Sequence, residues 1–179
     1  MTSKPYVPLH VHSEYSLLDG AIRISDLVNF AKDNGMPAVA LTDHGVMYGD
    51  MELYTTAKEA GIKPILGSEF YVHDGDIEEK NKLHNPCYHL VLLVKDKVGY
   101  QNLIKLTSVA WCKGRYVHPR INWDLIKEHH EGLICLSACL GGEVLQNLLN
   151  GDKEKAFAVA KQYKELFGDD IILNFKTTG

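Results

Sequence analysis

Short apolar runs alternate with amphipathic segments along this chain, and this alternation limits its possible folds more than any other feature. Runs of strand length occupy residues 6–12, 38–42, 64–72, 90–94, 132–138 and 170–175. Helical spacing of apolar residues fills the intervals, over residues 25–35, 48–60, 97–112, 123–130 and 141–167. Strands that alternate with helices are typical of parallel β/α units, so we expect an open doubly wound sheet or a closed barrel.

Small and polar residues mark where these segments begin and end. Ser25 is a candidate N-cap for the first helix, and Gly35 is a candidate stop for it. Asn150-Gly151 divides the last helical stretch into two helices. The polar residues 73–86 and the basic, aromatic residues 113–120 are expected to be loops.

The turn after the first apolar run lacks the G-x-G-x-x-G pattern, which disfavours a dinucleotide-binding domain. In open sheets and in barrels built of parallel strands, active sites lie at the carboxyl ends of the strands. Residues placed at the end of each apolar run are therefore the first candidates for function.

Two histidines close the first apolar run, at positions 10 and 12. In a strand, alternate side chains share a face, so His10 and His12 would converge on one point, as metal binding requires. Asp19 follows on the next turn and offers a hard oxygen ligand. The same His-x-His pattern also occurs on half-exposed strands that bind nothing, so the pair alone leaves both interpretations open.

Three further strand ends carry the same kinds of side chain. Asp43 and His44 directly follow the second apolar run, Glu69 lies late in the third, and Cys139 stands one residue past the fifth. Imidazole, carboxylate and thiol groups together suit zinc, manganese or iron in a multinuclear site, which favours phosphoester hydrolysis. Asp43 is better placed to orient a ligand than to be one.

Each of these residues also has an ordinary structural interpretation. Asp43 and His44 could form a hydrogen-bonded pair, Glu69 could be a solvated charge, and Cys139 could be an inert buried thiol. His89 begins its apolar run instead of ending it, so geometry alone makes it a structural histidine. The remaining histidines lie in polar segments and are expected to be solvated: His73, His84, His118, His129 and His130.

One cluster of basic residues is interleaved with aromatic ones, between positions 111 and 120. Lys113, Arg115 and Arg120 stand near Trp111 and Tyr116. This cluster is either a solvated loop or a contact for phosphate or single-stranded DNA. In the second case the basic side chains would supply charge and the aromatic rings a stacking face.

Composition indicates in which cellular setting and with which partners the chain would act. The net charge of −4 argues against a broad basic surface, so any contact with DNA would be local and assisted by metal ions. The four cysteines form no C-x-x-C pair and no secreted-type framework, which predicts a reducing, cytoplasmic setting. There is no signal-peptide run and no stretch near the ~18 apolar residues of a membrane span, so we expect no membrane partner.

Seven stretches, collinear over most of the chain, carry a resemblance to a known family. They are His10–Gly20, Ala40–Gly49, Pro64–Glu69, His89–Leu93, Gly99–Leu103, Pro119–Ile121 and Leu136–Glu143. Together they resemble the PHP family (polymerase and histidinol phosphatase). Tyr-Ser-Leu-Leu-Asp-Gly in the first stretch and Ser-Ala-Cys-Leu-Gly-Gly in the last are similar to its polymerase branch, the N-terminal domain of bacterial replicative polymerase alpha subunits.

The resemblance implies a fold, a metal site and an activity. The fold would be the start of a distorted seven-stranded (β/α) barrel. Two or three divalent ions (zinc, manganese or iron) would be held in the complete domain, and a metal-bound water would attack a phosphoester. The partners would be a DNA 3′ end or single strand and the other replicase subunits of the full-length protein. The implied ligands include His89 despite its position in the strand: His10, His12, Asp19, His44, Glu69, His89 and Cys139.

The end of the chain departs from the family pattern. Within Ile171–Gly179, Asn174 stands where the family has Glu, and Thr178 where it has His. The family's last Asp-x-His ligand pair and its polymerase domains are absent from the sequence. We therefore expect residues 1–179 to be one PHP domain, truncated before its final strands, with an incomplete barrel and bare sheet edges.

Three functions are consistent with these features. The leading hypothesis is an N-terminal fragment of a replicative DNA polymerase that carries most of a metal-dependent 3′–5′ exonuclease site. A free-standing phosphoesterase acting on small phosphate monoesters is the enzyme alternative, and the missing closing ligands count against it. The non-enzyme alternative is a structural domain that stabilises a polymerase or docks a proofreading subunit.

Overall fold

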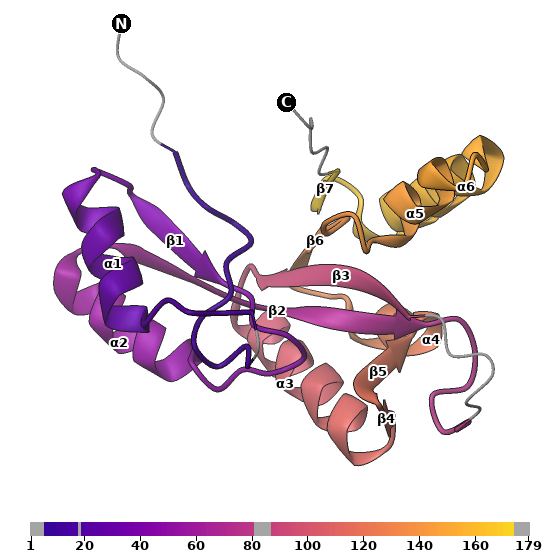
Figure 1. Cartoon of the computed structure of the whole chain (residues 1–179), viewed down its shortest axis with the longest axis horizontal. Helices are drawn as coiled ribbons and strands as arrows, with labels where there is room; N and C mark the ends of the chain where they lie inside the picture. The colour runs from indigo at the N-terminus through magenta and orange to yellow at the C-terminus, as the bar shows by residue number, and fades with distance from the viewer. Residues whose placement is uncertain (1–5, 18, 81–86, 174–179) are drawn as a thin grey trace, which may run out of the picture.

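The computed structural model describes residues 6–17, 19–80 and 87–173, which form a mixed α/β fold (Figure 1). Within these ranges seven strands form one sheet in the order β4-β5-β2-β3-β6-β7, with β1 paired to β2 outside that path. The strands are β1 (Ala38–Leu41), β2 (Lys63–His73), β3 (Cys87–Val94), β4 (Arg115–Tyr116), β5 (His118–Asn122), β6 (Leu133–Leu136) and β7 (Ile171–Ile172). The α/β class is confirmed, and the described sheet is open, not closed into a barrel.

Parallel and antiparallel pairs are mixed in this sheet, although the sequence pattern predicts parallel units throughout. β1 with β2, β2 with β5, and β6 with β7 are parallel. β3 instead runs antiparallel to both β2 and β6. The described part of the β2–β3 connection contains no helix, and a parallel return would need a long crossover of that kind.

The N-terminal segment, residues 6–12, lies beside β1 but is not a strand, so this prediction is wrong. Two backbone hydrogen bonds join it to the chain around β1. Ala40 N–H donates to the Pro8 carbonyl at 3.0 Å, and Thr42 N–H donates to the Val11 carbonyl at 2.8 Å. Val11 N–H donates to the Thr42 hydroxyl at 3.0 Å instead of to a backbone carbonyl. Pro8 has no N–H to donate, so a regular ladder cannot continue through it.

The expected loop at residues 113–120 contains a small hairpin. β4 and β5 pair antiparallel around Val117, with Tyr116 opposite His118. Val117 has a φ of 63°, in the left-handed region that a β-branched residue rarely adopts. The polar and aromatic composition of the segment gave no alternating pattern from which this hairpin could be predicted.

The helices follow the predicted apolar spacing closely, and they are α1 (Ile24–Asp33), α2 (Asp50–Ala60), α3 (Lys97–Cys112), α4 (Trp123–His129), α5 (Glu143–Leu149) and α6 (Lys153–Phe167). The N-cap of α1 is Arg23, not Ser25, and it makes no side-chain capping bond. None of these helices, within the described ranges, combines the length and apolar character that crossing a membrane requires.

Two apolar clusters hold the helices on the sheet. The larger one lies where α3, α4 and α6 cover β2, β3 and β6, and includes Phe70, Leu92 and Leu106. The smaller one packs α1 and α2 against β1 at one end of the sheet, around Val28 and Leu41, while α5 and α6 gather at the other end (Figure 1). The strands between these two clusters carry a group of buried polar residues.

Asn174 and Thr178, where the sequence departs from the PHP pattern, lie outside the described residues.

Candidate metal centre

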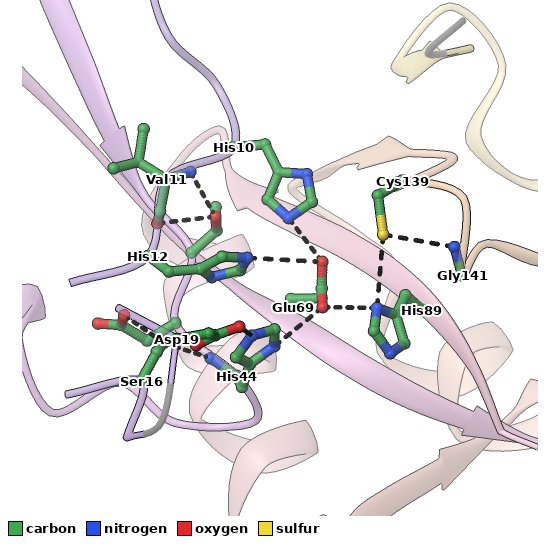
Figure 2. A network of polar contacts seen from close by, with 12 residues as sticks. His10, Val11, His12, Ser16, Asp19, His44, Glu69, His89, Cys139 and Gly141 are labelled. Carbon is green, nitrogen blue, oxygen red and sulfur yellow. Dashed lines mark hydrogen bonds and ion pairs between the residues drawn. The ribbon is translucent and has the colours of Figure 1, made fainter. Parts of the chain in front are cut away.

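A buried carboxylate on β2 is the centre of the polar site. Glu69 is 1% exposed, and histidine rings surround it (Figure 2). Its oxygens lie 2.5 Å from His10 Nε2, 2.9 Å from His44 Nδ1 and 2.8 Å from His89 Nδ1. His12 Nε2 stands farther off, at 4.0 Å. Four imidazole rings from three separate parts of the chain therefore face one carboxylate.

The loop after β1 brings His44 to this carboxylate. Gly45 N–H donates to the Glu69 carbonyl at 2.8 Å, and Glu69 N–H donates to the Asp43 carbonyl at 3.1 Å. Gly45 has a φ of 64°, and a Cβ there would lie 2.5 Å from the Pro119 ring. Only glycine fits at this turn, because it tolerates the left-handed conformation and leaves room for the hairpin.

His89 enters the site because β3 is antiparallel to β2. The beginning of β3 lies beside the end of β2, with His89 opposite Tyr71. The geometric objection to His89 assumed that its strand ran parallel to the others, and that assumption was wrong. The sequence offered no sign of the strand's direction.

Cys139 reaches the same place from the turn after β6. Its Sγ lies 3.6 Å from His89 Nδ1 and accepts from Gly141 N–H at 3.4 Å. Ala138, just before it, has a φ of 62°, a strained conformation for a residue with a side chain. This turn directs the thiol toward His89, on the side of Glu69 opposite His12 (Figure 2).

Asp19 and Asp43 hold the site from the outside in different ways. Asp19 Oδ2 lies 2.7 Å from His44 Nε2. Asp43 accepts from Ser13 N–H at 2.6 Å, Ser13 Oγ at 2.8 Å and Ser16 Oγ at 2.6 Å. The hydroxyl of Ser16 in turn accepts from His44 N–H at 3.1 Å. Asp43 therefore fixes the turn between His12 and Asp19, and the sequence reasoning missed the two serines through which it acts.

The nitrogen, oxygen and sulfur atoms of this cluster are arranged better for binding a metal ion than for hydrogen bonds among themselves. Both oxygens of Glu69, together with His10 Nε2, His12 Nδ1 and His44 Nδ1, are buried, and although some of them lie within ion-pair distance, none makes a contact of hydrogen-bond geometry within the described residues. In the part of the chain that the structure describes, two groups have ligand atoms that all lie within 4.8 Å of one another: His10, His12 and Glu69, and Glu69, His89 and Cys139. Glu69 belongs to both groups, as a bridging carboxylate would. Nitrogen, oxygen and sulfur donors together suit zinc and iron, and to a lesser degree manganese.

The charges of the cluster are strongly coupled. Burial opposes ionisation of Glu69, but the ring nitrogens of His10, His44 and His89 outweigh it and lower the pKa of that carboxyl. Contact with Cys139, and then with Glu69, raises the pKa of His89 to about 10. The same contact lowers the pKa of Cys139. A metal ion would have to displace the protons that the rings carry, so its binding would release protons.

Comparison with known proteins identifies the family of this arrangement. A sequence model of the PHP domain matches residues 8–178. The chain belongs to the PHP family. DNA polymerase III subunit alpha from Borreliella burgdorferi is 44% identical over 176 residues, covering 97% of the chain and 15% of that protein. The Helicobacter pylori protein of the same name is 42% identical over 187 residues, covering 99% of the chain and 15% of that protein.

The chain thus spans about 15% of the length of these relatives, and it matches their N-terminal part. Among solved structures, an amidohydrolase from Chromobacterium violaceum with bound sulfate and no metal has a TM-score of 0.50 and 19% identity. The similarity covers 84% of this chain and 74% of that one, and it supports the fold alone. The resemblance to the polymerase branch of the PHP family is confirmed.

All seven residues that the PHP resemblance marks as ligands line one cavity of about 800 Å³. Tyr6 from the N-terminal segment, Ala138 and Leu173 complete its wall. Tyr71 was missed by the sequence reasoning, and its ring lies 5.2 Å from that of His89. The alternation of β2 could have indicated Tyr71, because it stands two residues after Glu69 and shares its face of the strand.

The basic cluster of this PHP domain divides into buried and exposed residues. Arg120 is 1% exposed, and its guanidinium donates to the carbonyls of Gly114 at 3.0 Å, Ile77 at 2.6 Å and Glu79 at 2.8 Å. The expected contact of Arg120 with phosphate is therefore wrong, because the fold already surrounds its charge. Lys113 and Arg115 are exposed, and Arg115 lies over the Trp111 ring at 5.3 Å.

The histidines expected on the surface also divide. His73 is 5% exposed, so the expectation that it is solvated is wrong. His118 is exposed, yet its ring stacks on that of Tyr71 with centroids 4.3 Å apart. His84 lies outside the described residues.

Proposed function

We propose that this PHP domain is the N-terminal part of a replicative DNA polymerase and hydrolyses the phosphodiester at the 3′ end of single-stranded DNA. The observation that carries the proposal is the buried Glu69, shared by two groups of donor atoms and facing a cavity. The sequence similarity to DNA polymerase III alpha subunits supports DNA as the substrate and replicase subunits as partners of the full-length protein.

The residues that would hold metal ions fall into two groups. His10, His12 and Glu69 would hold one ion, and Glu69, His89 and Cys139 would hold a second. Zinc, manganese or iron would fit these donors, and two or three ions in the complete domain would suit the seven proposed ligands. When bound, such ions lower the pKa of a water and neutralise charge on a phosphodiester.

The chain itself has three tasks in this reaction. His44 is held on one side by Asp19, 2.7 Å from its Nε2, and on the other by Glu69, which fixes the ring orientation. Asp43 and its serine partners keep the turn that carries His12 and Asp19 in place. The cavity is wide enough, at about 800 Å³, to admit a nucleotide as well as a phosphate group.

We also propose that the open sheet is part of a distorted barrel of the PHP type. The first and the last residues that the structure describes, Tyr6 and Leu173, both line the cavity. Further strands between these two would close the sheet and cover its apolar residues. This arrangement would place additional ligands at the open side of the cavity.

Metal content and nuclease activity test the function together. Elemental mass spectrometry of the purified protein should find two or more bound zinc, manganese or iron ions per chain. A 3′-labelled single-stranded oligonucleotide should then lose nucleotides from its 3′ end. His12→Ala should abolish this activity, while His130→Ala, at the end of α4, should leave it unchanged.

Other outcomes would favour the alternatives. Faster hydrolysis of nucleotide monoesters than of single-stranded DNA would indicate a phosphoesterase acting on small molecules. A metal-free protein whose stability does not change with a chelator would indicate a structural or docking domain. Either result would contradict the proposed nuclease.

A further inference from the structure

Tyr71 connects the metal centre to a second aromatic group outside it. It lies on β2, and its ring packs edge-on against His89, with centroids 5.2 Å apart and planes at 89°. It also lies 6.2 Å from His44, with planes at 30°. Tyr71 therefore packs beside two proposed ligands without lining the cavity itself.

His118 stacks on the ring of Tyr71. Its ring is nearly parallel to that of Tyr71, with centroids 4.3 Å apart and planes at 17°. His118 is nevertheless exposed to solvent, so only part of its ring area is taken up by the stack. The two parallel rings thus lead from the ligand histidines to the surface.

The hairpin that carries His118 is fixed in place by tight contacts. Val117 at its tip is 74% exposed and has a φ of 63°, a costly conformation that surrounding contacts must maintain. Pro119 lies so close to Gly45 that a Cβ at Gly45 would meet its ring at 2.5 Å. Trp111 Nε1 donates to the Gly45 carbonyl at 2.7 Å. His118 is consequently positioned relative to the loop that carries His44.

The chemistry of the His118 ring favours a flat, uncharged group over a phosphate. Burial, and then the charges of His89 and His44, lower the pKa of His118. A lowered pKa favours the neutral form of the ring at neutral pH. A neutral ring with an accessible π-face offers little to an anion but stacks well on a nucleobase.

We infer that His118, backed by Tyr71, positions the substrate by stacking on the base of the 3′-terminal nucleotide while the phosphodiester lies in the cavity beside Glu69. This inference rests on the proposed nuclease function and names a part of the substrate that the site recognises. Stacking is available to all four bases, so recognition through His118 would be independent of sequence. His118 would hold the substrate through its base, and it would not contact the phosphodiester that is cleaved.

Two variants of the full chain separate stacking from other effects. His118→Ala removes the ring, and His118→Tyr keeps an aromatic face without the imidazole nitrogens. Each is compared on two single-stranded oligonucleotides that differ only in the base of the 3′-terminal nucleotide, which is thymine in one and missing in the other. We expect His118→Ala to raise KM for the base-bearing substrate about tenfold, with kcat nearly unchanged, and to leave KM for the abasic substrate unchanged. His118→Tyr should restore the wild-type KM.

Binding without catalysis keeps the test independent of the proposed activity. Fluorescence anisotropy of the same oligonucleotides, with EDTA present, should show tighter binding of the base-bearing one to the wild type and equal binding of both to His118→Ala. Equal losses on both oligonucleotides, or no binding preference in the wild type, would overturn the inference. A wild type that prefers the base through His118 but cleaves neither oligonucleotide would instead overturn the proposed function and leave the stacking site standing.

Discussion

Two buried carboxylates in this chain have opposite surroundings. Glu69 is 1% exposed and Asp50, in the first turn of α2, is 2% exposed. Four histidine rings lie within 4.0 Å of the Glu69 oxygens, whereas Asp50 has neither an ion pair nor a hydrogen bond of its carboxylate to any residue that the structure describes. Burial opposes the charge of both groups, yet the pKa of Glu69 is lowered, and burial followed by the charge of Asp43 raises the pKa of Asp50 to about 8.

The difference shows that neighbours, more than burial, decide what a buried carboxylate does. Imidazole rings keep Glu69 charged, which is the state that the proposed bridging of two ions would need. Asp50 has an acidic neighbour and no donor, so it stays protonated near neutral pH and costs stability when it ionises. Asp43 is a third buried carboxylate. It is 1% exposed and accepts three hydrogen bonds from Ser13 and Ser16.

Removal of the Glu69 charge should have the largest effect. In Glu69→Gln the rings would lose the anion that they surround, so we expect bound metal to fall from two or more ions per chain to none. Nuclease activity should fall at least about 100-fold, and the metal-free protein should lose about 3–5 kcal/mol of unfolding free energy. Elemental analysis, the 3′-end assay and urea unfolding measure these three changes.

The matched control for this variant is Glu78→Gln, a neutralised glutamate that is exposed in the loop after β2. It should change neither metal content nor stability. If Glu69→Gln kept its ions, Glu69 could not be the bridging ligand, and the comparison with Asp50 would lose its basis.

Asp43→Asn should have a smaller effect on the same site. The amide cannot accept from Ser13 N–H and both serine hydroxyls in the same way, so the turn that carries His12 and Asp19 should loosen. We expect metal affinity to fall about 10–100-fold, as for other residues that orient ligands. Competition with a chelator of known affinity measures this fall. Ser16→Ala should reproduce part of it, and an unchanged affinity in both variants would show that the turn does not position the ligands.

Much of this site could be predicted from the sequence, because strand ends concentrate the chemistry of such folds. The apolar runs alone placed His44 and Cys139 just past strand ends and Glu69 late in its strand, and all three line one cavity, although Glu69 lies inside β2 and not at its end. His89 required the family resemblance, since the direction of β3 is set by its pairing with β2 and β6 and not by its own residues.

The errors have equally specific causes. Residues 6–12 are apolar enough for a strand, but Pro8 interrupts the ladder. Arg120 lies in a segment of polar composition, and nothing local shows that the carbonyls of Ile77 and Glu79 converge on it together with that of Gly114. Asp50 is an acidic residue in the first turn of a helix, which is an ordinary surface pattern, and only the packing of α2 reveals that it is buried.

Asp50→Asn should have the smallest effect on the metal site and the clearest dependence of stability on pH. An unfolded aspartate titrates near pH ~4, so between about pH 4 and pH 8 the folded chain holds a proton at Asp50 that the unfolded chain releases. The unfolding free energy of the wild type therefore falls as pH rises through this range. The amide of the variant would not titrate, so the variant should be nearly equal to the wild type at about pH 4 and should gain stability over it by up to about 1.4 kcal/mol for each pH unit from there to about pH 8.

Urea unfolding of metal-free wild type and variant across this range measures the difference, and Asp26→Asn provides the control. Asp26 also lies in the first turn of its helix, α1, but is exposed, so its variant should show no gain in stability at high pH. A gain in Asp50→Asn that did not depend on pH would mean that the carboxyl is already charged in the folded chain at low pH. The two buried carboxylates would then differ in their partners but not in their charge.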